Sequence, residues 1–428
     1  MSGADHDPPR EVSGKLVYVS GRDPLRTSGG SESYAMGQAR AAVLAGYEPH
    51  MFSLTPKSEV LQTDYGFLHR VRSPVRPPRS ITSVLQRPWL VPAITRFLEG
   101  EPGPHIVHSF GAWADCGVTA CRQLERKGVH AVPLATVFMV IAHETRSKLA
   151  STVVRESPVW KPLHRLELAW VRTVTAPIEA RAYRRMPAVL VNYRSVERAL
   201  VEHYGPGMSI RHITYSPPTA LEDPPTDSAL PAPLQGFGDP QAPLIVSVSR
   251  HDGRKGIDVL IGALAGLRDA GVAFRACLVG PGLLLTAHRR LISRLALEDR
   301  VLIPGRVPAV TPYLMNCDIY VLPSVQEGSG AVAVLEALQT GAAIAASAID
   351  GIPEDLTDGH DSLLFAPGDQ DDLARTLTRL MNDSGLRARL SAQARATYER
   401  RFAAPVLARA LTELYTEFGL PPRVRNPA

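Results

Sequence analysis

The chain has 428 residues, of which 45% are apolar and 21% are charged, and its formal net charge is +5. This length exceeds one ordinary hydrophobic core and predicts two domains of about 200 residues each. The composition is that of a globular protein, and the mild positive charge fits anionic small molecules as ligands. No basic run with interleaved aromatic residues points to nucleic acid. Contact with an anionic membrane fits the charge but is not favoured.

The cysteines and the apolar stretches favour a cytoplasmic protein. The spacing of Cys116 and Cys121 does not fit a zinc knuckle, and Cys277 and Cys317 are isolated. We therefore expect reduced and mostly buried thiols. The N-terminus is polar and does not resemble a signal peptide. The longest apolar stretch, residues 131–142, contains Pro and Thr and is too short to span a bilayer, so we expect a buried strand there.

The first half of the chain alternates strands with helices. A strand is predicted at residues 16–20, and the loop Ser28-Gly29-Gly30-Ser31-Glu32-Ser33 leads to a helix at 34–45 that Gly46 ends. Further elements are strands at 48–52, 106–108, 134–141 and 189–191 and an Arg-rich helix at 163–185. This rhythm is typical of a doubly wound parallel sheet, and it predicts a Rossmann-like domain over residues 1–216.

A proline-rich segment separates this run from a second one. Residues 217–243 contain eight prolines and few periodic apolar residues, which indicates a linker. The second run fills a domain predicted at 244–402, with strands at 244–249, 273–279, 301–303, 319–322, 342–346 and 363–365. A helix at 406–417 is apolar on one side, and segment 403–428 is expected to pack back on the first domain. We therefore predict an α/β protein with two doubly wound Rossmann-like domains that face a central cleft.

The second domain opens with a basic loop after its first strand. Arg250-His251-Asp252-Gly253-Arg254-Lys255-Gly256 follows that strand and precedes a helix that starts near Ile257. Arg250 can grip two oxygens at once and Lys255 supplies a point charge, so the two cations can converge on a diphosphate. The alternative is a pair of solvated surface cations. Because ligands of parallel sheets bind at the carboxyl ends of the strands, the loop lies where a ligand is expected.

A second turn in this domain carries two carboxylates. A short apolar strand ends at Pro323-Ser324, and a turn with Glu327 and Gly328 leads into a helix from about Ala331 to Thr340. The unpaired N–H groups of a helix N-terminus favour phosphate. Glu327 and Glu336 bracket the turn, and carboxylates accept hydrogen bonds from sugar or ribose hydroxyls. The combination suggests a nucleotide-sugar site.

Several segments resemble, in order, the retaining glycosyltransferase family four, which has the two-domain glycosyltransferase-B fold and includes glycogen synthase-like and mannosyltransferase-like enzymes. The match is dense from about residue 244 to 375 and sparse in the N-terminal half. The matching segments are Ser28-Gly29-Gly30-Ser31-Glu32, Arg250 with Lys255-Gly256-Ile257-Asp258, Val279-Gly280-Pro281-Gly282, Gly305-Arg306-Val307, Glu327-Gly328-Ser329-Gly330 with Glu336-Ala337-Leu338, and Asp350-Gly351-Ile352-Pro353-Glu354-Asp355.

The resemblance implies a role for each matching position. Arg250 and Lys255 would neutralise the donor diphosphate, Glu336 would bind the ribose hydroxyls, and Glu327 would contact the transferred sugar. Backbone N–H groups of the turn would hold phosphate or sugar, and the loop Gly29-Gly30 would approach the diphosphate from the other domain. His143 matches a family histidine that contacts the donor sugar. The turn residues concerned are Gly328, Ser329, Gly330 and Ala331.

The spacing of the two glutamates departs from the family pattern. Family members place seven residues between them, whereas eight separate Glu327 from Glu336 here. An extra residue absorbed in the helix would rotate Glu327 by about 100°. A bulge at Ser329-Gly330 is the alternative, because glycine tolerates unusual backbone angles. Glu336 is therefore the firmer assignment.

The N-terminal half is expected to supply the acceptor site and part of the catalytic face. The candidates are Glu32, His108-Ser109, His143-Glu144 and Asn192-Tyr193-Arg194-Ser195, each after a predicted strand. A histidine at the carboxyl end of a parallel strand can reach the cleft. For both histidines the alternative is a structural histidine with satisfied hydrogen bonds.

Three other signals are better explained without a ligand. Asp369-Gln370-Asp371-Asp372 precedes a helix, so capping is favoured over metal binding. Gly280-Pro281-Gly282 lacks the third glycine of a dinucleotide site. The Arg-rich stretch 165–185 is interpreted as a solvated helix face rather than a membrane surface.

These observations predict a retaining, metal-independent glycosyltransferase that needs no cofactor. The donor would be a UDP- or GDP-linked sugar, and the acceptor a small soluble molecule, as in the biosynthesis of a specialised metabolite such as an antibiotic. A hydroxyl and a thiol acceptor both remain open, as does the oligomeric state. The alternatives are a lipid or polysaccharide acceptor, a nucleotide-sugar epimerase or hydrolase, and a non-catalytic sugar-nucleotide-binding protein.

Overall fold

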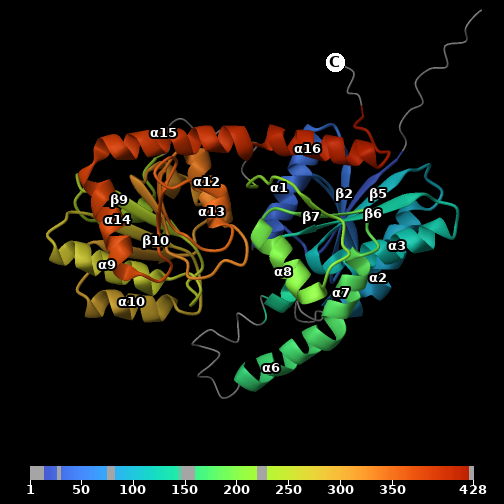
Figure 1. Cartoon of the computed structure of the whole chain (residues 1–428), viewed down its shortest axis with the longest axis horizontal. Helices are drawn as coiled ribbons and strands as arrows, with labels where there is room; N and C mark the ends of the chain where they lie inside the picture. Colours follow the sequence, from blue (N-terminus) through green and yellow to red (C-terminus); the bar gives the residue numbers. More distant parts are fainter. Residues whose placement is uncertain are drawn as a thin grey trace, which may run out of the picture.

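The computed structural model describes residues 14–26, 30–74, 82–143, 145, 160–218 and 229–423. They form two α/β domains that lie side by side, each with a central sheet between helices (Figure 1). The predicted fold class is therefore confirmed. Of the predicted linker, residues 217, 218 and 229–243 are described.

The first domain contains an eight-stranded sheet in the order β3-β4-β2-β1-β5-β6-β7-β8. All neighbours are parallel except β3 and β4. Strands β1 and β5 are buried along their whole length, as expected where helices cover both faces. The strands are β1 Leu16–Gly21, β2 Pro49–Thr55, β3 Glu59–Thr63, β4 Gly66–Arg72, β5 His105–Phe110, β6 Ala131–Val137, β7 Ala188–Val191 and β8 Ile210–His212.

Two predicted helices of this domain have other bounds in the structure. The first helix begins at Gly30 rather than residue 34, and the Arg-rich helix is broken by a π-helical segment, Val171–Thr175, which splits it into α6 and α7. Helix α6 projects from the body of the domain (Figure 1). The helices are α1 Gly30–Leu44, α2 Thr82–Leu98, α3 Ala114–Glu125, α6 Trp160–Trp170, α7 Ala176–Tyr183 and α8 Arg194–Tyr204, with a 3-10 turn at Gly111–Trp113.

The second domain contains a six-stranded parallel sheet in the order β11-β10-β9-β12-β13-β14. The strands are β9 Leu244–Val248, β10 Arg275–Val279, β11 Val301–Gly305, β12 Ile319–Leu322, β13 Ala343–Ser347 and β14 Leu363–Phe365. The helices are α9 Ile257–Asp269, α10 Leu285–Arg294, α11 Thr311–Met315, α12 Val332–Thr340, α13 Ile352–Asp355, α14 Gln370–Asn382 and α15 Ser384–Arg401, with a 3-10 turn at Ala232–Leu234.

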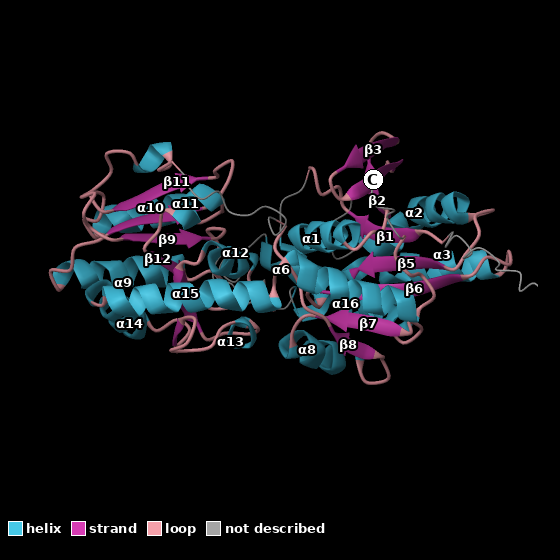
Figure 2. Cartoon of the chain, turned by 90° about the horizontal axis from the view of Figure 1, so that it is seen from above, coloured by secondary structure: helices cyan, strands magenta, loops and turns pink. Residues whose placement is uncertain are grey.

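The last helix, α16 Ala404–Glu417, returns to the first domain and packs against α1 (Figure 2). It continues the direction of α15 along the top of the molecule (Figure 1). The Tyr415 hydroxyl lies 2.9 Å from the Tyr18 hydroxyl of β1 and 2.9 Å from Nδ1 of His108 on β5. This buried polar contact holds the end of the chain on the first sheet.

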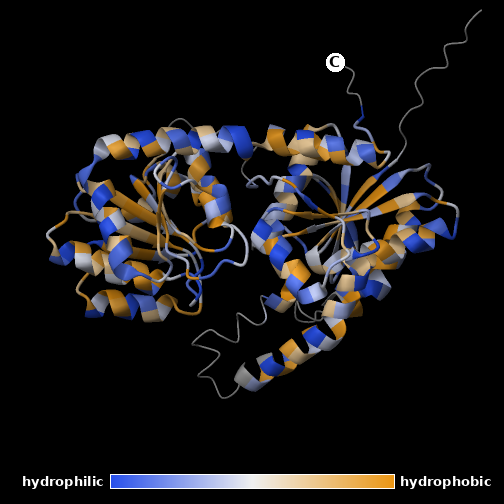
Figure 3. Cartoon of the chain, viewed as in Figure 1, coloured by the Kyte–Doolittle hydropathy of each residue, from blue (hydrophilic) through white to orange (hydrophobic). Residues whose placement is uncertain are grey.

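The apolar residues of both sheets are enclosed by helices whose outer faces are polar (Figure 3). One core cluster spans the two domains, since it contains Tyr34 and Tyr215 of the first and Ala331 and Ile352 of the second. The domains therefore share packed apolar surface near the cleft. In the described part of the chain, no helix combines the length and apolar character needed to cross a bilayer. The four cysteines are free thiols, as predicted, and Cys317 alone is partly exposed.

Candidate active site

The turn between β12 and α12 forms the centre of the candidate site. Strand β12 is fully buried, and the chain then turns at Gly328, whose φ of 81° is unfavourable for other residues. Helix α12 runs from Val332 to Thr340, and Gly341 after it is left-handed at φ 67°. Both ends of the predicted helix are thus confirmed to within a residue.

Lys255 and Glu327 form a buried ion pair at this turn. The Lys255 ammonium lies 2.7 and 2.6 Å from the two carboxylate oxygens of Glu327, and the side chains are 16% and 5% exposed. The Ser324 hydroxyl donates a further bond of 2.5 Å to the same carboxylate. Gly256 beside the lysine is left-handed at φ 59°, and an added Cβ there would overlap the Pro323 carbonyl. The two loops therefore pack directly on each other at the carboxyl ends of β9 and β12.

The extra residue between the two glutamates lies outside the helix. Residues 328–331 are irregular, and α12 starts only at Val332, so Glu327 is not rotated about the helix axis. The amides of Glu327 and Gly328 both donate to one oxygen of Asp350, at 2.7 and 2.6 Å. The expectation that the Gly328 amide would hold phosphate or sugar therefore needs correction, because in this structure that amide is already bound to a carboxylate.

Arg250 is placed differently from Lys255. Its side chain is 61% exposed, and its guanidinium lies 3.2 Å from the Asp252 carboxylate. The structure therefore leaves Arg250 at the open rim of the basic loop while Lys255 is held inside. Arg250 can rotate toward an incoming anion at little cost, because an ion pair with such an exposed arginine is weak.

Glu336 lies on the second turn of α12. Burial raises the pKa of its carboxyl to about 7. The carboxyl is close enough to Tyr34 and Tyr320 to raise the pKa of both phenols, for which burial is the larger cause. A carboxyl that titrates near neutral pH in a cleft is a common feature of ligand-binding sites.

The first domain brings His143 and Met139 to the same turn. A Cβ atom built on Gly328 would lie 3.7 Å from the Met139 sulfur and 3.9 Å from Cδ2 of His143. The His143 ring also lies 6.0 Å from the His203 ring. His143 therefore reaches across the cleft, as predicted for a residue after that strand. Glu144 and Gly29 lie outside the described residues, and Gly30 is the first residue of α1 with open space around it.

A hollow opens in the first domain at the carboxyl ends of β1, β5 and β6. Glu32 is 5% exposed there, and its carboxylate lies 3.8 Å from the Arg22 guanidinium. Its lining combines charged, hydroxyl and aromatic side chains, namely Ser20, Arg22, Ser31, Glu32, Phe110, Trp113, Phe138, Met139 and Ile141 with the short segment Gly111–Ala112. Because Met139 lines this hollow and also contacts the Gly328 turn, the hollow adjoins the candidate donor site.

His108 is a structural residue. It is fully buried, and its ring nitrogens lie 2.9 Å from the Tyr415 hydroxyl and 2.7 Å from the Thr136 hydroxyl. Burial lowers the pKa of His108 to about 3, so it is neutral at physiological pH. Ser109 is likewise fully buried. The structure therefore supports the structural interpretation of His108 over the functional one.

The sequence interpretation assigned no role to three residues that shape the site, Asp350, Asp355 and Tyr215. Asp350 binds the turn, and Asp355 accepts hydrogen bonds from Tyr193 and Tyr215 of the first domain. The motif around Asp350 was recognised only as a resemblance, and no local pattern indicates a partner more than 100 positions away. The predicted cap at Asp369, in contrast, is confirmed by its 2.9 Å bond from the Asp372 amide.

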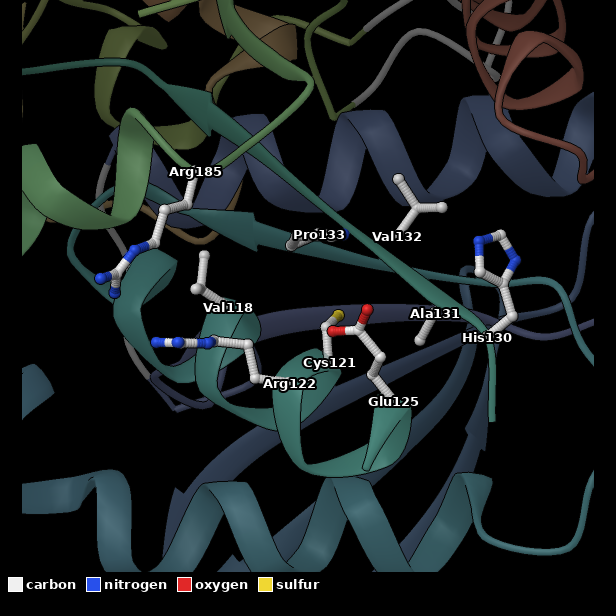
Figure 4. Close-up of a pocket in the computed structure, with 9 residues that line it drawn as sticks. All are labelled: Val118, Cys121, Arg122, Glu125, His130, Ala131, Val132, Pro133 and Arg185. Carbon is white, nitrogen blue, oxygen red and sulfur yellow. The ribbon is translucent and has the colours of Figure 1, made fainter. Parts of the chain in front are cut away.

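A larger cavity lies away from this site. It has a volume of about 480 Å³ and is lined by the end of α3 and the start of β6, with Arg122 and Arg185 on one side and Glu125 and His130 on the other (Figure 4). It sits at the amino ends of the parallel strands, so it faces away from the cleft. Across the described part of the chain, no cluster of three or more His, Cys, Asp or Glu side chains is arranged to hold a metal ion.

Two family models match the chain. The model for "Glycosyl transferases group 1" matches residues 236–397, and the model for "Glycosyltransferase Family 4" matches residues 28–215. The chain belongs to glycosyltransferase family four. The first of these matches includes the whole second sheet and the second includes all strands of the first sheet except β1, so both domains carry the family pattern.

Curated family members resemble parts of the chain. It is 30% identical over 233 residues to a 2-deoxystreptamine glucosyltransferase of Streptomyces kanamyceticus. The aligned region covers 53% of this chain and 59% of the relative. A putative colanic acid biosynthesis glycosyltransferase of Escherichia coli K12 is 34% identical, with coverage of 41% and 45%. An alpha-D-kanosaminyltransferase of Streptomyces kanamyceticus is 25% identical, with coverage of 58% and 66%. The chain thus spans about half to two thirds of the length of these relatives.

Solved structures of glycosyltransferases share the fold over nearly the whole chain. Sucrose-phosphate synthase from Thermosynechococcus elongatus superposes with a TM-score of 0.72 at 20% identity and covers 94% of this chain and 99% of that one. HepE of Anabaena in complex with UDP gives a TM-score of 0.69 at 16% identity, with coverage of 94% and 100%. These similarities establish the glycosyltransferase-B fold.

Proposed function

We propose that the protein is a retaining glycosyltransferase that moves a sugar from a nucleoside-diphosphate sugar to a small soluble acceptor. The observation that carries this proposal is the buried Lys255–Glu327 pair at the β12–α12 turn, with Glu336 on the following helix and His143 across the cleft. A cation beside two carboxylates suits a ligand that joins a diphosphate to hydroxyl-rich rings.

Each residue has a chemical task in this mechanism. Lys255 and Arg250 stabilise the negative charge that develops on the departing diphosphate. Glu336 accepts hydrogen bonds from the ribose hydroxyls, and Glu327 orients the transferred sugar while it holds the lysine. His143 contacts that sugar from the first domain. The acceptor attacks on the face from which the diphosphate leaves, and the donor phosphate takes the acceptor proton, so the proposal requires no separate protein base.

The hollow beside Glu32 is the proposed acceptor site. Its polar side chains Ser20, Arg22 and Glu32 can bind hydroxyl or amino groups. The relative named for 2-deoxystreptamine, an aminocyclitol, supports a small polar acceptor and thus a role in specialised-metabolite biosynthesis. The relative named for colanic acid favours a second candidate, a polysaccharide or lipid-linked acceptor. Complexes of HepE with UDP and with UDP-glucose support a nucleotide-sugar donor.

A binding screen tests the proposal. UDP, GDP, ADP and dTDP are titrated calorimetrically against the wild type and against Arg250→Ala. The control variant is Arg126→Ala, which removes another exposed arginine, directly after α3. We expect one nucleotide to bind the wild type, and its affinity to fall about tenfold in Arg250→Ala only. If no nucleotide binds, or if both variants lose affinity equally, the proposed donor site is wrong.

Turnover is expected to survive removal of divalent ions. Because Lys255 and Arg250 neutralise the leaving group in the proposal, dialysis against EDTA should leave the rate of nucleoside diphosphate release unchanged. The release is measured with and without added Mg²⁺. A strict requirement for the ion would contradict the mechanism.

Donor affinity is expected to rise with pH through the titration of Glu336. The carboxyl titrates at about 7 in the free protein because it is buried, and ribose hydroxyls bind best to its anionic form. Donor binding therefore lowers this pKa and releases a proton. Affinity for an intact nucleotide sugar should increase about tenfold from pH 6 to pH 8. The affinity of Glu336→Gln for the nucleotide sugar should depend little on pH. If this variant kept the same pH dependence as the wild type, Glu336 would have no role in binding the ribose.

A further inference from the structure

The two domains are joined beside the candidate site by an interdomain junction, which we define as Tyr193, Tyr215, Glu354 and Asp355. The hydroxyls of Tyr193 and Tyr215 both donate to one oxygen of Asp355, at 2.7 and 2.6 Å. Asp355 is 2% exposed. The Glu354 carboxylate accepts bonds from the first amides of α8, those of Arg194 at 2.9 Å and Ser195 at 3.2 Å. A helix of the first domain is thus capped by a side chain of the second.

The junction lies at the two places where the chain crosses between the domains. The Thr214 and Ser216 hydroxyls donate to the carbonyls of Arg401 and Phe402, each at 2.5 Å. The Arg401 guanidinium in turn donates to the carbonyls of Asp355 at 2.9 Å and of Glu354 at 2.6 Å. Helices α13 and α8 occupy the facing edges of the two domains (Figure 2). A rotation of one domain against the other would therefore pivot near these contacts.

The two residues before α13 hold the β12–α12 turn. Asp350, two residues before α13, binds the amides of Glu327 and Gly328, and the Gly351 amide donates to the Ser329 carbonyl at 3.1 Å. Asp350 is left-handed at φ 51°, a conformation that costs free energy in residues other than glycine and persists only where surrounding contacts enforce it. Residues 350–355 are therefore bound to the β12–α12 turn at their start and to the first domain at their end.

Tyr193 touches the turn directly. Cβ atoms built on Gly330 and on Gly351 would overlap its side chain. Both positions therefore need glycine for the ring to reach Asp355. Tyr215, the other tyrosine that binds Asp355, packs edge-on against Tyr34 of α1, with ring centroids 4.9 Å apart. The junction is thereby connected to the core of the first domain.

We propose that α13 couples the relative position of the two domains to the conformation of the β12–α12 turn, with Tyr193 as the positioning residue. Rotation at the pivot moves Tyr193 against Gly330 and pulls on Asp355. That displacement passes through Asp350 to the amides of Glu327 and Gly328, and hence to the carboxylate that holds Lys255. The turn would reach its donor-binding geometry only in one arrangement of the domains. The inference rests on the proposed function only where it calls this turn a donor site.

Hydrogen exchange in the ligand-free full chain tests the coupling. Tyr193→Phe removes one hydroxyl at the junction, and Glu354→Ala removes the cap of α8. Tyr47→Phe is the control, because it removes a tyrosine hydroxyl bond of 3.0 Å to Leu420 elsewhere in the first domain. We expect amide exchange across residues 324–331 to rise about tenfold in Tyr193→Phe and in Glu354→Ala, but not in the control.

Two outcomes would overturn the proposal. The first is unchanged exchange across 324–331 in both junction variants. The second is faster exchange spread equally over both sheets, which would indicate a general loss of stability instead of local coupling. Turnover provides a separate readout, in which Tyr193→Phe should lower kcat about tenfold relative to Tyr47→Phe. If the wild type binds no nucleotide, the proposed function fails, while the exchange result still decides the coupling.

Discussion

Lys255→Ala is expected to lower kcat by about 10²-fold or more. The ammonium is only 16% exposed, so it acts in a poorly solvated environment where a single charge contributes most to a developing anion. The variant also leaves the Glu327 carboxylate buried without its cation, which adds to the loss. The rate is measured as release of nucleoside diphosphate at saturating donor.

Two comparisons separate leaving-group stabilisation from general effects. Lys127→Ala removes the same charge from an exposed pair with Glu99, 2.9 Å long, and should leave kcat unchanged. Nucleoside diphosphate affinity of Lys255→Ala should fall less than kcat, since the lysine acts most strongly as charge develops. Near-normal turnover in Lys255→Ala would remove the lysine from the mechanism.

Gly330→Ala is expected to have an effect of similar size for a steric reason. The added Cβ would overlap the Tyr193 hydroxyl and lie 2.8 Å from a carboxylate oxygen of Asp355. The turn must then move away from the junction, so we expect kcat to fall by about 10²-fold and the free energy of unfolding by about 1–3 kcal/mol. Turnover and urea denaturation provide the two measurements.

The matched control is Gly266→Ala on the exposed side of α9, where an added Cβ meets nothing within 4 Å. It should retain both turnover and stability. Tyr193→Ala alone should be destabilising, because it removes a buried ring. If the overlap with Tyr193 causes the cost at Gly330, adding Gly330→Ala to Tyr193→Ala should lower the free energy of unfolding less than Gly330→Ala does in the wild type. An equal loss in the two backgrounds would show that the cost at Gly330 does not come from Tyr193.

Local sequence patterns were sufficient where a short buried run of apolar residues is bounded by turn-forming residues. Strand β12 at Ile319–Leu322 and strand β14 at Leu363–Phe365 were predicted to the residue, because short apolar runs end there at turn-forming residues. Gly341 marked the end of α12 for the reason that a left-handed cap favours glycine.

Local patterns failed where an element is exposed or irregular. Strand β3 at Glu59–Thr63 has an exposed face and charged residues, so it showed no strand period. Helix α2 contains Pro88 and Pro92, which argue against a helix in isolation. The π-helical break at Val171–Thr175 has no sequence signature.

The sequence by itself determined the two-domain α/β organisation and the family, because strand–helix alternation and ordered short motifs are properties of neighbouring residues. It also singled out Lys255, Glu327 and Glu336 as candidate site residues. Only the tertiary structure decided which groups meet. Lys255 and Glu327 are 72 positions apart, and Tyr193 and Asp355 are 162 apart. Such contacts depend on how two sheets and a pivot are arranged in space, and no local spacing encodes that arrangement.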